Sequence, residues 1–154
     1  MMFRFPEFSR DLHRGEEGAV GDLLNRAYGG GAEAKTVDGL RRAGVIAGEV
    51  VLPCQGGIVG YYALSRMRAP GGALCVGPVA IDPDWQRAGH GRRMIGLLAE
   101  WARLSGTCVL AEGCEAFFAR AGFRASGVDG LWLAGPARDL SGVELLFPKA
   151  FDRT

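Results

Sequence analysis

The spacing of apolar residues changes from a helical to a strand-like period at Val45, and this change limits the folds open to the chain. Before it, apolar residues recur every three or four positions over Glu16–Tyr28 and, more weakly, over Glu33–Ala43, and glycines follow both stretches. After it, Val, Ile and Tyr dominate Val45–Leu52 and Ile58–Met67, which a turn with proline and glycine separates. The pattern predicts two amphipathic helices followed by two antiparallel strands.

The rest of the chain mixes the two periods. A long helix is predicted at Gly89–Leu104, and its buried face is expected to carry Met94, Leu97, Leu98, Trp101 and Leu104. A short helix is predicted at Glu115–Ala121. Further strands are predicted at Ala73–Ile81 (broken by Gly77-Pro78), Thr107–Ala111, Leu131–Ala134 and Val143–Phe147. Because no repeat or linker interrupts the pattern, we expect one mixed α/β domain over residues 1–154.

The charge balance and the cysteines argue against several classes of protein. Eighteen Lys and Arg against 17 Asp and Glu give a net charge of +1, so bulk charge favours neither nucleic acid nor an anionic membrane. No apolar stretch approaches the roughly 20 residues that cross a bilayer, and the N-terminus lacks a signal-peptide pattern, so we expect a cytoplasmic protein. Neither C-x-x-C pairs nor histidines at metal spacing accompany the cysteines, so we expect reduced thiols and no metal site.

The segment Val79–Arg93 carries the strongest functional signal. It leaves a predicted strand and enters a helix through two closely spaced glycines, Gly89 and Gly91. The unpaired N–H groups of a first helical turn and the helix dipole both favour an anion there. The glycines place no side chain in front of those N–H groups, while Arg87 and Arg92 add positive charge. The segment therefore predicts a phosphate-binding loop.

Three kinds of phosphate-binding loop compete for this segment. A Walker loop is excluded because neither lysine nor a hydroxyl residue follows Gly91. A dinucleotide-binding turn fits poorly, because seven residues separate Ile81 from Gly89 and Met94 stands at the third glycine position. Glu112, past the next strand, is nevertheless placed as a ribose ligand would be, so a dinucleotide-binding oxidoreductase stays an alternative.

The third kind of loop matches a known family. Gln86–Gly91 resembles the Q/R-x-x-G-x-G/A acyl-coenzyme A signature of the GNAT superfamily of N-acetyltransferases. Gly77–Pro83 resembles the strand before that loop, and Glu115–Phe123 resembles the late helix that ends in Gly-Phe. Asn25–Tyr28 and Glu33–Arg41 are similar to a compact bacterial branch labelled YhbS-like. The resemblance implies the GNAT acyl-CoA N-acyltransferase fold, a mostly antiparallel sheet that is splayed at the cofactor strand and flanked by helices.

The resemblance also implies a reaction and a set of coenzyme-binding residues. The reaction is direct acetyl transfer from acetyl-CoA to the primary amine of a small molecule or peptide. A backbone N–H of the cofactor strand would face the developing oxyanion. The implied coenzyme-binding residues are Val79, Ile81, Gln86, Arg87, Ala88, Gly89, His90, Gly91, Arg92, Phe117 and Phe118. We expect no nucleic-acid or membrane partner, and a monomer or homodimer.

The chain departs from the family at the general acid. Family members commonly place a tyrosine four residues before the glycine of Gly-Phe, and Phe118 stands there. Tyr61, Tyr62, Cys114 or a water are the open alternatives. If the coenzyme thiol resembles cysteine, with a pKa of ~8.5, expelling it unprotonated at pH 7 costs only about 2 kcal/mol. The loss of the acid would therefore slow the reaction without preventing it.

The sequence offers several candidate catalytic groups and does not choose among them. Glu49 lies on the first long strand, Glu112 and Glu115 lie beside the late helix, and Cys114 precedes that helix. For each carboxylate a solvated surface charge is the more common role, by roughly three to one, and for Cys114 an inert small residue is the favoured interpretation. Because Phe118 lacks a hydroxyl and no base is evident, a second hypothesis is a non-catalytic module that senses or sequesters acyl-CoA.

Overall fold

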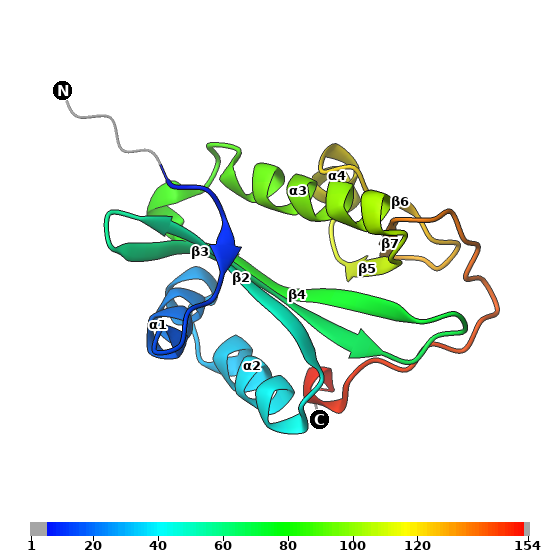
Figure 1. The fold of residues 1–154 in the computed structure, drawn as a ribbon, viewed down its shortest axis with the longest axis horizontal. Helices are drawn as coiled ribbons and strands as arrows, with labels where there is room; N and C mark the ends of the chain where they lie inside the picture. Colours follow the sequence, from blue (N-terminus) through cyan, green and yellow to red (C-terminus); the bar gives the residue numbers. More distant parts are fainter. Residues whose placement is uncertain (1–5, 153–154) are drawn as a thin grey trace.

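The computed structural model describes residues 6–152, and its described strands form one sheet with helices on both faces (Figure 1). The strand order is β1-β2-β3-β4-β5-β7-β6, and among these neighbours β4 and β5 are the parallel pair. The strands are β1 (Arg10–Asp11), β2 (Ile46–Cys54), β3 (Gly57–Met67), β4 (Ala73–Ile81), β5 (Val109–Glu112), β6 (Arg124–Ala125) and β7 (Leu131–Ala134). The helices are α1 (Glu17–Tyr28), α2 (Ala32–Ala43), α3 (His90–Ser105) and α4 (Glu115–Arg120), with 3₁₀ turns η1 (Pro83–Trp85) and η2 (Lys149–Phe151).

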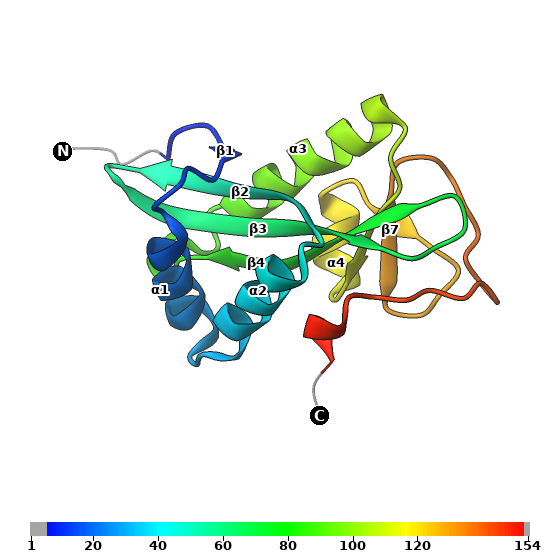
Figure 2. The ribbon, with the colours of Figure 1, turned by 60° about the horizontal axis from the view of Figure 1, so that its bottom comes forward.

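The helices cover the sheet in two pairs, with α1 and α2 on one face and α3 and α4 on the other (Figure 2). On the first face, α1 buries Val20, Leu23 and Leu24 in a cluster with Tyr61 of β3. On the second face, α3 and α4 share a larger cluster with β2 to β5 and β7. A buried Leu or Val side chain contributes about 1.5–3 kcal/mol, so these buried clusters fix both helix pairs on the sheet.

The sheet opens between β4 and β5. These strands pair only from Leu74 to Val76, opposite Val109 to Ala111. The register between β3 and β4 then shifts, so that Gly77 and Pro78 together stand opposite a single residue of β3. An extra residue of this kind bends a strand and interrupts its pairing. The expected splay at Gly77-Pro78 and the expected mixed α/β fold are both confirmed.

The buried face of α3 differs from the predicted one. The buried residues of α3 are Met94, Ile95, Leu98, Ala99 and Ala102. Leu97, Trp101 and Leu104 are instead 60%, 43% and 71% exposed, so the prediction was wrong for these three. The buried face includes the small side chains of Ala99 and Ala102, and the segment after α4 lies close to it, because a Cβ on Gly122 would lie 3.5 Å from the Cβ of Ala99. A prediction that follows only the spacing of large apolar residues therefore chooses the neighbouring face of α3.

The segment Val143–Phe147 is not the strand that its alternating sequence predicted. Its pairing with the sheet is a single bridge, in which Leu146 exchanges hydrogen bonds of 3.0 and 2.9 Å with Arg68. Val143, Leu145 and Phe147 pack against the apolar cluster beneath β5 and β7. Their alternation thus reflects burial of every second side chain along an irregular segment. The short strands β1 and β6 were also not predicted, because two residues give no measurable period.

Candidate functional site

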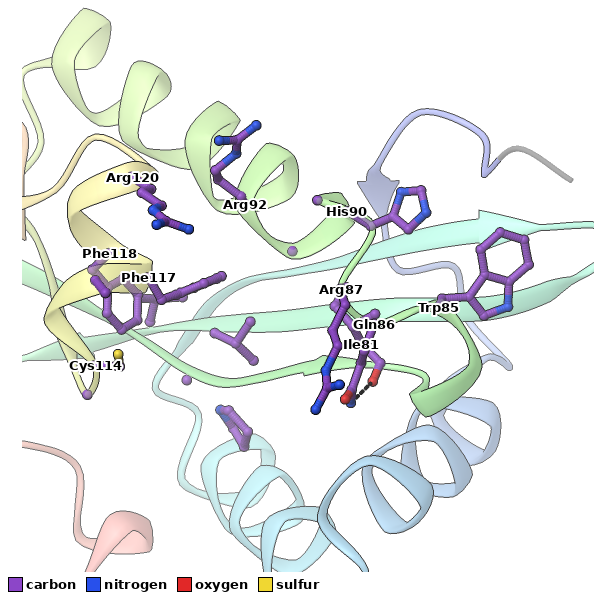
Figure 3. A pocket seen from close by; sticks show the side chains of 18 of the residues that line it. Ile81, Trp85, Gln86, Arg87, His90, Arg92, Cys114, Phe117, Phe118 and Arg120 are labelled. Carbon is purple, nitrogen blue, oxygen red and sulfur yellow. Dashed lines mark hydrogen bonds between the residues drawn. The ribbon is translucent and has the colours of Figure 1, made fainter.

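A cleft of about 890 Å³ lies where β4 and β5 separate. Its walls come from β4, the loop between β4 and α3, the first turn of α3, and the turn that joins β5 to α4 (Figure 3). Ten of the eleven residues predicted to bind a coenzyme line it, and Ala88 is the exception. The structure therefore brings the predicted loop, strand and late helix to one place.

The register of β4 shows which backbone groups face the cleft. The N–H of Asp82 donates to the carbonyl of Val59 on β3 at 2.8 Å, so these opposite residues form a hydrogen-bonded pair. Hydrogen-bonded and non-hydrogen-bonded pairs alternate along an antiparallel ladder. Ile81 and Val79 therefore belong to non-hydrogen-bonded pairs, and their N–H groups point away from β3. Because the β5 pairing has already ended at Val76, these N–H groups face the open cleft.

Side chains already donate hydrogen bonds to the carbonyls of Val79 and Ile81 on this edge of β4. The hydroxyl of Tyr28 donates to the carbonyl of Val79 at 2.5 Å, and the side-chain amide of Gln86 donates to the carbonyl of Ile81 at 2.9 Å. The edge of β4 thus presents N–H donors to a ligand along an extended strand. An amide-containing chain is the kind of ligand that such an edge binds as an added strand.

The loop that enters α3 presents further N–H groups. Asp82 accepts from the N–H of Asp84 at 3.0 Å and starts the turn η1. Arg87 and Gly89 then adopt positive φ angles of 66° and 84°. No side chain caps α3, and the N–H groups of its first turn have no acceptor within the helix. The positive end of the helix dipole therefore points into the cleft, as an anion site requires.

The two glycines of the loop serve different purposes. Gly89 needs its left-handed conformation, which costs most other residues roughly 1–2 kcal/mol. Gly91 instead allows a close approach, because a Cβ there would lie 3.3 Å from Ile81 and 3.5 Å from Phe117. Gly91 therefore lets α3 pack against the cofactor strand, a role that the sequence alone did not suggest.

Three arginines line the cleft from three elements: Arg87 from the loop, Arg92 from α3 and Arg120 from α4 (Figure 3). Together with the helix dipole they favour a ligand with several negative charges. His90 also lines the cleft, where its ring lies 2.6 Å from the Arg93 guanidinium. Partial burial and the Arg93 charge lower the pKa of His90, which favours the neutral imidazole.

The late helix supplies an aromatic wall. Phe118 is only 6% exposed, and its ring centroid lies 5.1 Å from that of Phe117 and 5.3 Å from that of Phe123. Both Phe117 and Phe118 line the cleft. Phe118 thus fills the core and forms part of the cleft wall at once, and its position carries no proton donor.

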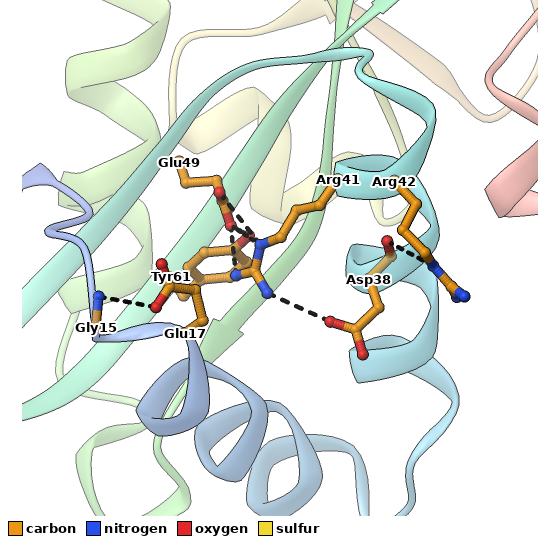
Figure 4. Close-up of polar contacts among 7 residues, drawn as sticks. All are labelled: Gly15, Glu17, Asp38, Arg41, Arg42, Glu49 and Tyr61. Atoms are coloured by element: carbon orange, nitrogen blue, oxygen red, sulfur yellow. Dashed lines mark hydrogen bonds and ion pairs between the residues drawn. The ribbon is translucent and has the colours of Figure 1, made fainter.

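The structure separates the candidate catalytic groups. Glu112 and Cys114 line the cleft, whereas Glu115 and Glu49 are not part of its lining. Glu49 instead binds Arg41 at 2.7 Å and accepts a hydrogen bond of 2.7 Å from the hydroxyl of Tyr61 (Figure 4). The structure therefore does not support Glu49 as the base, because its carboxylate already binds Arg41 and Tyr61 and lies outside the lining of the cleft.

The two buried tyrosines are also placed away from the cleft. Tyr61 is fully buried, and burial together with Glu49 raises its pKa far above the ordinary value. Burial and the charge of Asp11 raise the pKa of Tyr62 to about 12. Neither tyrosine lines the cleft. The structure therefore does not support the sequence-based suggestion that one of them replaces the missing acid.

The sequence did not predict a place in the cleft for Tyr28 or Arg120. Arg120 lies three residues after Phe117, and this helical spacing would have placed both on one face of α4. The sequence around Tyr28 does not indicate its contact with β4, because 51 positions separate it from the carbonyl that it binds. Only the packing of α1 against β4 brings it to the cleft.

A second cavity of about 680 Å³ adjoins the cleft from the face covered by α2. The two share the side chains or backbone of Tyr28, Val76, Gly77, Pro78, Glu112 and Gly113. Carboxylates of Glu33, Glu112 and Asp152 line the second cavity, and its described lining contains no Lys, Arg or His. The opening between β4 and β5 thus connects a cleft rich in arginine with a cavity rich in carboxylates.

Comparison with known families decides the class of protein. A family model described as an acetyltransferase (GNAT) domain matches residues 45–125, more than half of the 154 residues. The chain belongs to the GNAT acetyltransferase family. The match confirms the predicted resemblance, and its residues run from β2 to β6 and so include the cofactor strand, the loop and α4. The GNAT fold also excludes the dinucleotide-binding alternative, whose sheet is mostly parallel.

Solved GNAT structures share the fold over most of the chain. The YhbS N-acetyltransferase from Escherichia coli, solved with CoA, is 24% identical and covers 95% of this chain and 92% of its own, with a TM-score of 0.80. A GNAT acetyltransferase from Brucella melitensis, solved with acetyl-CoA, is 22% identical and covers 94% and 97%, with a TM-score of 0.81. The ribosomal-protein-S18-alanine N-acetyltransferase from Escherichia coli is 18% identical and covers 85% and 94%, with a TM-score of 0.64. No curated protein matched the sequence.

Among residues 6–152, no helix combines the length and the apolar character needed to cross a membrane. The same residues contain no group of three or more His, Cys, Asp and Glu side chains placed to hold a metal ion.

Proposed function

We propose that the protein is an acetyl-CoA-dependent N-acetyltransferase that acts on the primary amine of a small molecule or peptide. The observation that carries this proposal is the edge of β4, where the N–H groups of Val79 and Ile81 face the cleft beside a positively charged loop. An acyl-CoA combines the two matching features, a diphosphate and an amide-containing arm. The structures of YhbS with CoA and of the Brucella protein with acetyl-CoA support the same ligand.

The cleft residues fit the donor in order along its length. The pyrophosphate would accept hydrogen bonds from the N–H groups of residues 87–92, with Arg87, Arg92 and Arg120 balancing its charge. The pantetheine arm would pair with the cleft-facing N–H of Ile81, which leaves the N–H of Val79 for the carbonyl of the thioester. The thioester would then reach the opening at Gly77-Pro78, where the cleft meets the second cavity.

The second cavity supports an amine as the acceptor. Its carboxylates attract a protonated amine, and an amine must lose a proton before its nitrogen attacks a carbonyl. Of the candidate bases, Glu112 lines both cavities, and we assign it this role directly or through a water. As nitrogen adds to the thioester carbonyl, the N–H of Val79 would stabilise the oxyanion, and breakage of the C–S bond releases the thiol.

A second function follows from one specific observation. Phe118 occupies the position of the usual tyrosine and has no proton to give, which favours a module that binds acyl-CoA without turnover. The missing acid is a moderate obstacle, because a thiol with a pKa of ~8.5 is a fair leaving group without protonation. The catalytic hypothesis therefore remains the better supported one.

Two measurements test the proposal. Thermal unfolding with acetyl-CoA or with NAD should raise the midpoint only for acetyl-CoA, because a ligand that binds the native state stabilises it by mass action. Thiol release from acetyl-CoA at pH 8 should then rise with at least one member of a panel of primary amines. A midpoint that acetyl-CoA does not move would reject both functions. A clear shift with no thiol release across the panel would favour the non-catalytic module.

A further inference from the structure

We propose that the hydroxyl of Tyr28 protonates the departing thiolate, in place of the tyrosine that the family commonly has where Phe118 stands. The assignment rests on the proposed acetyl transfer and adds a proton donor to it. Phe118 is buried among Phe117 and Phe123, so α4 offers no hydroxyl from this position. A donor must therefore come from another element that reaches the same stretch of β4.

The position of the Tyr28 hydroxyl meets this requirement. Its oxygen lies 2.5 Å from the carbonyl oxygen of Val79. The N–H of the same residue, Val79, is the donor that we assign to the oxyanion, and both groups face the cleft. A hydroxyl that binds one end of this residue lies next to the reacting thioester. Tyr28 also lines both cavities, which places it at their junction.

The end of α1 is fixed against the site from two sides. Tyr28 is the last residue of α1, and Gly29 ends the helix in a left-handed conformation with a φ of 74°. Two residues earlier, Arg26 binds the carboxylate of Asp82 at 3.0 Å, at the start of the loop that enters α3. The ion pair ties α1 to the residues directly after the cofactor strand. The tyrosine is thus held by its own hydrogen bond and by a neighbouring contact.

The other hydroxyl and thiol groups are placed less well. Of the three tyrosines in the sequence, Tyr28 is the one that lines either cavity. Cys114 lines the cleft but not the second cavity, so it does not reach the junction. Glu112 does reach the junction, and there it serves the opposite task of receiving the amine proton. Tyr28 and Glu112 together supply the two proton transfers that amide formation needs.

The step balances as follows. The C–N bond forms, the C–S bond breaks, and the electron pair of the C–S bond goes to sulfur. The Tyr28 hydroxyl gives its proton to that sulfur and leaves the free thiol. The proton lost by the amine, held by Glu112, returns to the Tyr28 oxygen directly or through water. The net reaction is amine plus acyl thioester to amide plus thiol.

The test compares Tyr28→Phe with Tyr62→Phe, which removes a hydroxyl that lies outside both cavities. With the best amine of the panel, we expect Tyr28→Phe to lower kcat by about 10- to 100-fold, at the low end of general-acid contributions because the thiol leaves readily. Its KM for acetyl-CoA and its thermal shift with acetyl-CoA should stay close to those of the unaltered protein. Tyr62→Phe should keep kcat within about twofold.

A hydroxyl placed at residue 118, where the family commonly has a tyrosine, tests whether Tyr28 acts as a proton donor or only positions other groups. In Tyr28→Phe/Phe118→Tyr the hydroxyl returns on α4, and we expect kcat to recover by about tenfold or more in a protein whose midpoint shows that it is folded. An unchanged kcat in Tyr28→Phe, or a loss of activity that comes only from a higher KM for acetyl-CoA, overturns the assignment. Absence of thiol release by the unaltered protein overturns the proposed acetyl transfer itself, and the tyrosine role with it.

Discussion

Replacement of Glu49 by alanine should destabilise the protein and leave its chemistry intact. Glu49 joins two partners on the face of the sheet that α1 and α2 cover: the guanidinium of Arg41 and the hydroxyl of Tyr61, each at 2.7 Å (Figure 4). The side chains of Arg41 and Glu49 are 24% and 13% exposed, so solvent compensates the loss of the ion pair only in part. Tyr61 is fully buried and would lose its acceptor.

The size of the effect follows from these two contacts. A buried hydroxyl without a partner costs about 1–3 kcal/mol, and loss of the partly buried ion pair adds about 1 kcal/mol. The sum of about 2–4 kcal/mol corresponds to a fall in Tm of roughly 5–15 °C for a chain of this length. Because Glu49 does not line the cleft, kcat/KM at a temperature where the variant is folded should stay within about twofold.

Two matched variants sharpen the measurement. Tyr61→Phe leaves the ion pair with Arg41 in place and should cost only about 1 kcal/mol. Asp38→Ala removes the exposed partner that lies 3.4 Å from Arg41 and should cost less than about 0.5 kcal/mol. Thermal unfolding and thiol release would be measured on each. The reasoning is refuted by a Glu49→Ala protein that keeps its Tm and loses tenfold or more in kcat/KM, since that result would make Glu49 a catalytic base.

Three further predictions test the loop, the core and the alkaline stability. Gly89→Glu should abolish the thermal shift with acetyl-CoA, because it puts a negative side chain at the N-terminus of α3, where φ is 84°. An unchanged shift would show that acetyl-CoA binds elsewhere. Leu98→Ala should lower the free energy of unfolding by about 2–5 kcal/mol, whereas Leu97→Ala, at an exposed position, should change it by less than about 0.5 kcal/mol in denaturant titrations. Burial raises the pKa of Tyr62 to about 12, so the native state keeps a proton that the unfolded chain loses near pH 10. Stability should therefore fall between about pH 10 and 12, and Tyr62→Phe should flatten this fall if the reasoning holds.

The local patterns of the sequence determined the elements and the donor loop. Helices over α1, α2 and α3 and the long strands β2 to β4 follow from periods and glycine stops that lie within each segment. The loop from Gln86 to Gly91 could also be predicted from the sequence. Anion binding by backbone N–H groups depends on a few adjacent residues that permit one backbone conformation. The bulge at Gly77-Pro78 belongs to the same class of local signal.

The tertiary structure decided which residues meet across the open sheet. Glu49 and Glu112 are both carboxylates on strands, and only the fold shows that one binds Arg41 and the other borders both cavities. The face of α3 also depended on how closely α4 approaches, which no period in α3 encodes. Tyr28 reaches Val79 across 51 positions of sequence. Contacts between residues so far apart in sequence arise from packing between elements, and the pattern within a single segment does not predict which distant residues it will contact.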